Sequence, residues 1–97
     1  NIRRPYSISM RRNPDFMLRN VADSIVLVPV GKAAAEFSGM VTLNATSAFL
    51  WQLLETEQSV ESMVAAMTDR YEVTDAKANA DILAFVQTME SAGAILR

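Results

Sequence analysis

A short apolar segment that runs directly into a helix is the feature that most constrains this fold. Residues 40–43 (Met40, Val41, Thr42 and Leu43) carry no charge and have the pattern of a short strand. Asn44 follows at once, and its side-chain oxygen can accept a free backbone N–H at the start of a helix. The helix predicted over residues 45–56 has an apolar stripe at helical spacing, made of Phe49, Leu50, Leu53 and Leu54. Trp51 lies off this stripe and is expected to pack against the sheet.

Two apolar segments before this corner are also predicted to be strands. Residues 15–21 form the first, and residues 24–31 form the clearest one because they are rich in β-branched side chains. Turn residues separate the two segments, and a connector bounded by Gly31 and Gly39 leads to the third strand. We therefore expect a three-stranded antiparallel sheet with the second strand in the middle.

Two more helices follow the first one. Residues 60–72 and 75–92 have apolar side chains at helical spacing, and Ser59 and Thr74 are suitable N-terminal caps. Gly93 is the expected left-handed stop of the last helix, after which the chain folds back on the core or adds a strand. A three-stranded antiparallel sheet followed by three helices is an α+β domain of winged-helix-like architecture.

The first fourteen residues differ from the rest of the chain in charge. Four of the nine basic residues lie there, whereas the chain from residue 13 onward has five basic and eleven acidic residues, a net charge of −6. Proline residues interrupt this segment, and no apolar period runs through it. We therefore expect an irregular basic arm over residues 1–14, which is either a solvated tail or a segment that docks on a partner or a second subunit. The folded domain is expected over residues 15–97.

The residue types that the chain lacks limit its chemistry. Cysteine and histidine are both absent from its 97 residues, which removes disulfides, thiolate nucleophiles, imidazole bases and nearly all zinc sites. The acidic residues of the helical half show no catalytic or metal-binding spacing, so we expect no enzyme activity, no metal and no cofactor. No apolar run approaches the roughly 20 residues of a membrane span, and no signal peptide is visible, so we expect a cytoplasmic protein.

The strand at residues 40–43 is the first candidate for a binding site. In the predicted sheet it lies at an edge, without the charge or proline that usually guards an edge. Such an edge can accept a peptide as an additional strand, unless the arm or the tail of the same chain covers it. Leu83 and Val86 widen the apolar surface of the last helix, which is either well buried or forms the wall of a groove beside this edge. Asp81, near that groove, is a candidate contact for a basic peptide.

Seven short segments of the chain match a family pattern in their order and spacing. They are residues 16–19, 26–31, 37–40, 43–46, 49–54, 71–73 and 92–96. Together they resemble the PqqD family, small domains named for a protein of pyrroloquinoline quinone biosynthesis and also known as RiPP recognition elements. The resemblance implies binding of the leader segment of a ribosomally made precursor peptide, which adds as a strand to the third strand and rests against the third helix. It also implies a non-catalytic domain that hands the peptide to a modifying enzyme, typically a radical SAM enzyme.

The resemblance further implies which residues make the site. Carried over by position, Met40, Val41, Thr42 and Leu43 would supply the main-chain ladder, and Leu83, Val86 and Gln87 would contact the peptide from the last helix. The resemblance also suggests a homodimer that forms by exchange of the arm or of the first strands.

Two other classes of function compete with peptide binding. A winged-helix domain can bind DNA as a regulator, but the last two helices offer only Arg70 and Lys77, whereas a recognition helix needs several donors for bases and phosphates. An enzyme would require a carboxylate pair in a pocket, and no spacing suggests one. The sequence does not identify the precursor peptide, nor whether its product is pyrroloquinoline quinone or another modified peptide.

Overall fold

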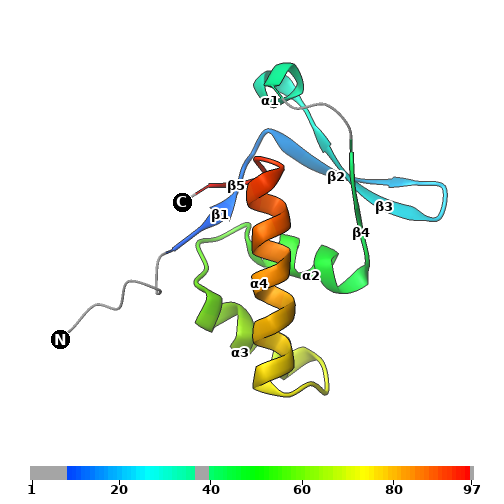
Figure 1. Ribbon diagram of the computed structural model, residues 1–97. Helices are drawn as coiled ribbons and strands as arrows, with labels where there is room; N and C mark the ends of the chain where they lie inside the picture. Colours follow the sequence, from blue (N-terminus) through cyan, green and yellow to red (C-terminus); the bar gives the residue numbers. More distant parts are fainter. Residues whose placement is uncertain (1–8, 37–39, 97) are drawn as a thin grey trace.

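The computed structural model describes residues 9–36 and 40–96. Within them, the chain forms a mixed α+β domain with a three-stranded antiparallel sheet, as predicted. Figure 1 shows the longest helix, α4 (Asp75–Ser91), running through the middle of the molecule, with α2 (Ala45–Leu53) and α3 (Val60–Arg70) beside it and the sheet at one end.

The sheet has the strand order β2-β3-β4, which confirms that the second predicted strand lies in the middle. β2 (Phe16–Val21) and β3 (Ser24–Pro29) form a hairpin whose two-residue turn places Ala22 at φ 55°. A positive φ at the first turn residue matches the twist of a tight hairpin. β4 (Val41–Leu43) is one residue shorter than predicted, because Met40 lies outside the strand.

A short helix, α1 (Gly31–Glu36), lies where the sequence predicts only a connector. Gly31 begins it with φ 56°, a conformation that favours glycine, and a run of alanine residues follows. Ala33 belongs to the buried core cluster, so tertiary packing helps to hold this short helix in place. The rest of the predicted connector, residues 37–39, lies outside the described residues.

All three predicted helix caps are confirmed. Asn44 accepts a hydrogen bond from the Ser47 N–H at 2.8 Å, Ser59 forms a capping box with Ser62, and Thr74 accepts from the Lys77 N–H at 3.1 Å. Each cap satisfies a backbone donor that the first turn of a helix leaves free. Gly93 has φ 79° at the end of α4, as the sequence predicts.

The prediction of an irregular arm is wrong for the part of it that the structure describes. Met10 is only 2% exposed, and its backbone exchanges two hydrogen bonds with that of Gln58. β1 (Arg11–Arg12) then pairs with β5 (Ile95–Leu96), the strand that the sequence allowed after Gly93. The folded domain therefore begins by residue 10, and β1 pairs within its own chain. The prediction for residues 1–8 lies outside the described part.

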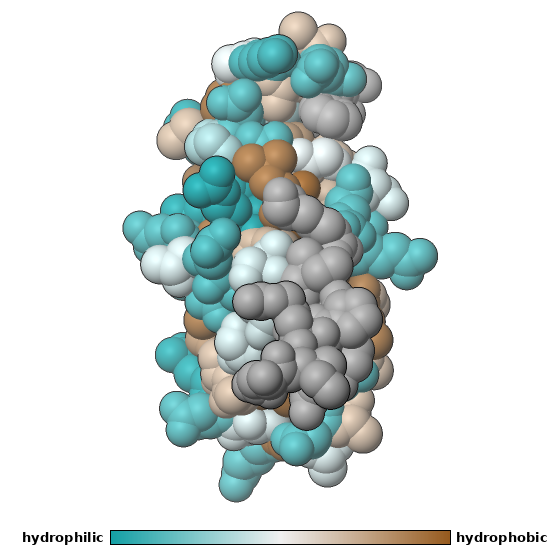
Figure 2. Space-filling model, turned by 90° about the vertical axis from the view of Figure 1, so that its left-hand side faces the viewer, coloured by the Kyte–Doolittle hydropathy of each residue, from teal (hydrophilic) through white to brown (hydrophobic). Residues whose placement is uncertain are grey.

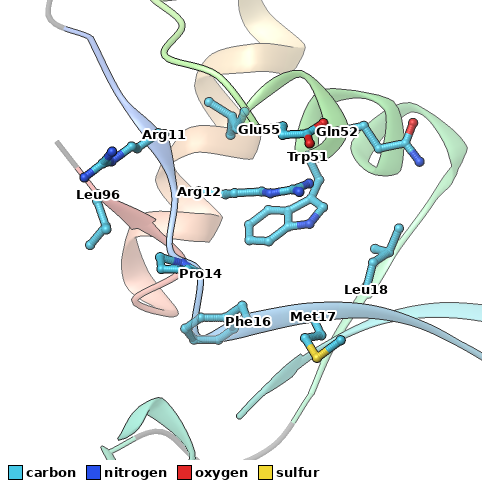
Figure 3. Close-up of a pocket in the computed structure, with 11 residues that line it drawn as sticks. Arg11, Arg12, Pro14, Phe16, Met17, Leu18, Trp51, Gln52, Glu55 and Leu96 are labelled. Atoms are coloured by element: carbon cyan, nitrogen blue, oxygen red, sulfur yellow. The ribbon is translucent and has the colours of Figure 1, made fainter. Parts of the chain in front are cut away.

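A single hydrophobic core joins the sheet to the helices. Leu27 from β3, Trp51 from α2, Met63 from α3 and Ile82 from α4 all belong to one cluster of buried side chains. Figure 3 shows the Trp51 ring directed from α2 toward β2, which agrees with the predicted packing against the sheet. Among the described residues, no buried side-chain polar atom lacks a hydrogen-bond partner, so the core carries no uncompensated polar group.

Candidate peptide-binding groove

β4 is an edge strand of the sheet. It pairs with β3 on one side, and no described strand lies on its other side. The alternative that the arm or the tail covers this edge does not hold for the described residues, because β1 and β5 pair with each other instead. The outer side of β4 therefore has no strand partner among the described residues.

The hydrogen bonds of β3 fix which of its residues face β4. The Val30 N–H donates to the Asp15 C=O at 2.7 Å, in register with the β2–β3 pairing. Backbone groups in an antiparallel ladder point alternately to the two sides of a strand. Since Val30 faces β2, Leu27 and Ile25 must direct their N–H and C=O groups toward β4.

Thr42 is the residue of β4 whose backbone faces outward. Val41 and Leu43 lie opposite Leu27 and Ile25, so their backbone groups face β3. Thr42 lies between them and, by the same alternation, directs its N–H and C=O away from the sheet. Its side chain is exposed, and none of its backbone groups has a hydrogen-bond partner among the described residues. An extended peptide could pair with β4 at this position.

A groove of about 670 Å³ lies beside this edge. β4 and the start of α2 form one wall, and α4 forms the other, with Tyr71 and Val73 at the connection before α4. The Phe49 and Tyr71 rings meet edge to face with centroids 5.5 Å apart, and the Arg70 guanidinium lies over both rings. These contacts pack Tyr71, at the end of α3, against Phe49 of α2 beside the groove.

One ion pair lies in the α4 wall of the groove. Lys77 Nζ and Asp81 Oδ1 are 2.9 Å apart, one helical turn from each other. The Lys77 side chain is mainly exposed, so the pair contributes little to stability. The groove therefore offers a lysine and a carboxylate that already balance each other's charge.

The structure places the predicted α4 contacts on different faces of the helix. Asp81 lines the groove, as predicted. Leu83 is 50% exposed but lines a separate hollow against α3, and Val86 is 6% exposed and belongs to the core. Gln87 is exposed and does not line the groove. Peptide contacts by Leu83, Val86 and Gln87 are therefore not favoured by this geometry.

Several α4 residues that line the groove were not predicted as site residues from the sequence. Beside Lys77 and Asp81, they are Ala84, Phe85, Thr88 and Met89. Residues three, four and seven positions apart share one face of a helix, so Asp81 predicts its neighbours at 84, 85 and 88. The available signal was this spacing from Asp81, whereas Leu83 and Val86 were chosen for their apolar character.

Metal, membrane and nucleic-acid binding are the other classes of function to compare with the described surface. Figure 2 shows a mainly hydrophilic face with small, separate apolar areas, which are normal for a protein surface. In the part of the chain that the structure describes, no three acidic residues are grouped as metal ligands, and no helix is long and apolar enough to cross a membrane. For DNA binding, α3 carries Arg70 and α4 carries Lys77, which is paired with Asp81. Nothing in this geometry supports the DNA-binding alternative.

Fold and site together define a small α+β domain with a free sheet edge beside a helix. The model of the family described as coenzyme PQQ synthesis protein D (PqqD) matches residues 24–95, so the chain belongs to the PqqD family. No curated protein sequence matches the chain. Among solved structures, "TbiB1 in Complex with the TbiA(beta) Leader Peptide" matches with a TM-score of 0.69 and 19% sequence identity, covering 88% of this chain and 93% of that one. At this identity the likeness establishes the fold.

Proposed function

We propose that this domain binds the leader segment of a ribosomally made precursor peptide as a fourth strand on β4. The outward-facing backbone of Thr42, beside the β4–α4 groove, is the observation that carries the proposal. Main-chain bonds to an added strand supply affinity, and the groove selects among the side chains of that strand. Membership of the PqqD family and the likeness to a leader-peptide complex support the same function.

The domain, in this proposal, delivers the leader to a modifying enzyme and performs no reaction itself. The chain has no histidine and no cysteine, so most nucleophilic and acid–base chemistry would have to come from the partner. For a PqqD-family domain the partner is expected to be a radical SAM enzyme of the cytoplasm. The product is pyrroloquinoline quinone or another modified peptide.

A titration followed by nuclear magnetic resonance tests this function. The ¹⁵N-labelled chain would be titrated with a synthetic leader, taken from a short precursor reading frame that neighbours the gene of this protein. We expect amide shifts at Thr42 and at the groove positions Asp81, Phe85 and Thr88. Peptide-induced protection of the Thr42 N–H from exchange would identify strand addition. Shifts confined to other parts of the chain would refute the proposal.

A further inference from the structure

A second cavity lies beside β2, the strand at the other edge of the sheet from β4. It has a volume of about 850 Å³ and is bounded by β1, β2, α2 and the end of β5. Figure 3 shows Arg12 lying over the Trp51 ring, with Leu18 and Phe16 of β2 directed toward the same space. No residue lines both this cavity and the β4–α4 groove. The two spaces can therefore be filled at the same time.

The charge of this cavity is unusual for the chain. Arg11 and Arg12 line it, with Glu55 as its one acidic residue, whereas the chain from residue 13 onward carries a net charge of −6. The Arg12 guanidinium is 5.6 Å from the centre of the Trp51 ring, and Arg12 is partly buried. Neither arginine forms an ion pair with any described residue. A partly desolvated cation on an aromatic ring, without a carboxylate partner, favours binding of an anionic group.

The backbone of β2 adds a second feature to this cavity. Asp15 faces β3 through its bond to Val30, so alternation directs the backbone groups of Leu18 and Asn20 away from β3. No described strand pairs with that edge, and Leu18 also lines the cavity. An extended chain added to β2 would therefore pass beside Arg12.

We infer that an extended, acidic segment of a second protein docks along β2, with a carboxylate on Arg12 and an apolar side chain against Leu18. Under the proposed function, on which this inference rests, the second protein is the modifying enzyme. The basic cavity within a chain of net negative charge gives the charge complementarity that selects an acidic segment. Because the leader occupies the other edge of the sheet, leader and enzyme bind without displacing each other.

Two short peptides test the docking surface on the full chain. The acidic probe is acetyl-Glu-Val-Glu-Ile-Glu-amide, and the control replaces each glutamate with lysine. We expect the acidic probe to shift the Trp51 indole N–H, which is the one tryptophan signal of the chain, and the amides of Leu18 and Asn20. Binding should weaken at least about tenfold from low salt to 0.5 M salt, because the charges are near the surface. Equal shifts with the lysine peptide, or none at Trp51, would overturn the inference.

Two arginine variants give a matched comparison. Arg12→Gln should weaken the acidic probe about fivefold or more, whereas Arg70→Gln, which removes an arginine from two other aromatic rings, should leave its affinity unchanged. The amide spectrum of each variant reports whether it is folded. If Arg12→Gln does not fold, Arg12→Lys serves as a second variant that keeps the positive charge. Equal loss in Arg12→Gln and Arg70→Gln would overturn the inference, as would inorganic phosphate alone reproducing every shift, which indicates a simple anion site.

The docking inference and the leader proposal fail in different ways. A leader that shifts Thr42, together with an acidic probe that leaves Trp51 unchanged, removes the docking surface and keeps the leader site. An acidic probe that shifts Trp51, together with a leader that binds nowhere near Thr42, refutes the proposed function and leaves an acidic-segment site of another role. Competition between leader and acidic probe would overturn the inference that the two bind independently.

Discussion

The two outer edges of the sheet have the same backbone chemistry but different surroundings. β4 is three residues long and lies beside a groove in which Lys77 and Asp81 are paired. β2 is six residues long and lies beside a cavity in which Arg11 and Arg12 have no ion-pair partner among the described residues. Unpaired N–H and C=O groups allow strand addition at either edge. If both edges accept strands as proposed, the side chains around each edge, and not the backbone, decide which segment it binds.

Arg11 and Arg12 of β1 supply the positive charge beside the β2 edge. Met10, which directly precedes β1, is buried in the core. Met10→Ala should lower the free energy of unfolding by about 2–4 kcal/mol, because a fully buried methionine side chain is replaced by a cavity. Urea unfolding measures this change. Met40→Ala, at a side chain 60% exposed beside the other edge, is the matched control and should change stability by less than about 0.5 kcal/mol. Similar values for the two variants would mean that β1 is not part of the folded body.

Proline at each edge tests the two edges directly. Thr42→Pro removes the outward N–H of β4 and should weaken leader binding by about 1.5–3 kcal/mol, roughly 10–150-fold. The fold should survive, since proline is tolerated on an edge strand where the N–H faces outward. Asn20→Pro makes the matched change on β2 and should leave leader affinity unaltered. Thr42→Val, which loses the hydroxyl but keeps the N–H, should bind the leader nearly as well as the unmodified chain.

Calorimetric titration with the leader would measure these affinities, and thermal unfolding would verify the fold of each variant. A leader that binds Thr42→Pro as tightly as the unmodified chain would contradict strand addition on β4. A larger loss in Asn20→Pro than in Thr42→Pro would assign the leader to the β2 edge instead.

The cap at Asn44 holds the end of β4 against α2. Asn44→Ala removes the 2.8 Å bond to the Ser47 N–H and should destabilise the domain by about 1 kcal/mol, a decrease in Tm of about 4–8 °C. Asn44→Asp, which retains an oxygen acceptor, should recover most of this loss. Because Trp51 lies by the other edge, its fluorescence in the folded state should not change. A change there would show that the two edges are coupled through α2.

Local rules predicted most of this fold from the sequence. The three helices begin at residues whose side chains can cap a first turn, and the caps at Asn44, Ser59 and Thr74 need no tertiary information. The helix α1 was missed because its glycine and alanine residues carry no apolar period. β1 was missed for a different reason: its partners are distant in sequence, because Met10 bonds to Gln58 and β1 pairs with β5.

The site was predicted less completely than the fold. The edge position of β4 followed from strand order, and Asp81 was placed correctly in the groove wall. The orientation of α4 about its own axis depends on how α3 and the sheet pack on it. Leu83 and Val86 were therefore assigned to the groove on apolar character, whereas packing turns them toward α3 and the core. The outward face of Thr42 also required the register of the ladder, which no local pattern contains.

The ion pair of the groove should have the smallest effect. A double-mutant cycle of Lys77→Ala and Asp81→Ala is expected to give a coupling of about 0.3 kcal/mol, since both groups are partly exposed and the lysine precedes the carboxylate. The coupling should vanish in about 1 M salt. Repeating the cycle on leader affinity distinguishes two roles for Asp81. If the leader offers a basic side chain to Asp81, Asp81→Ala should weaken its binding more than Lys77→Ala does. Equal effects would mean that the ion pair only shapes the wall of the groove and does not recognise the charge of the leader.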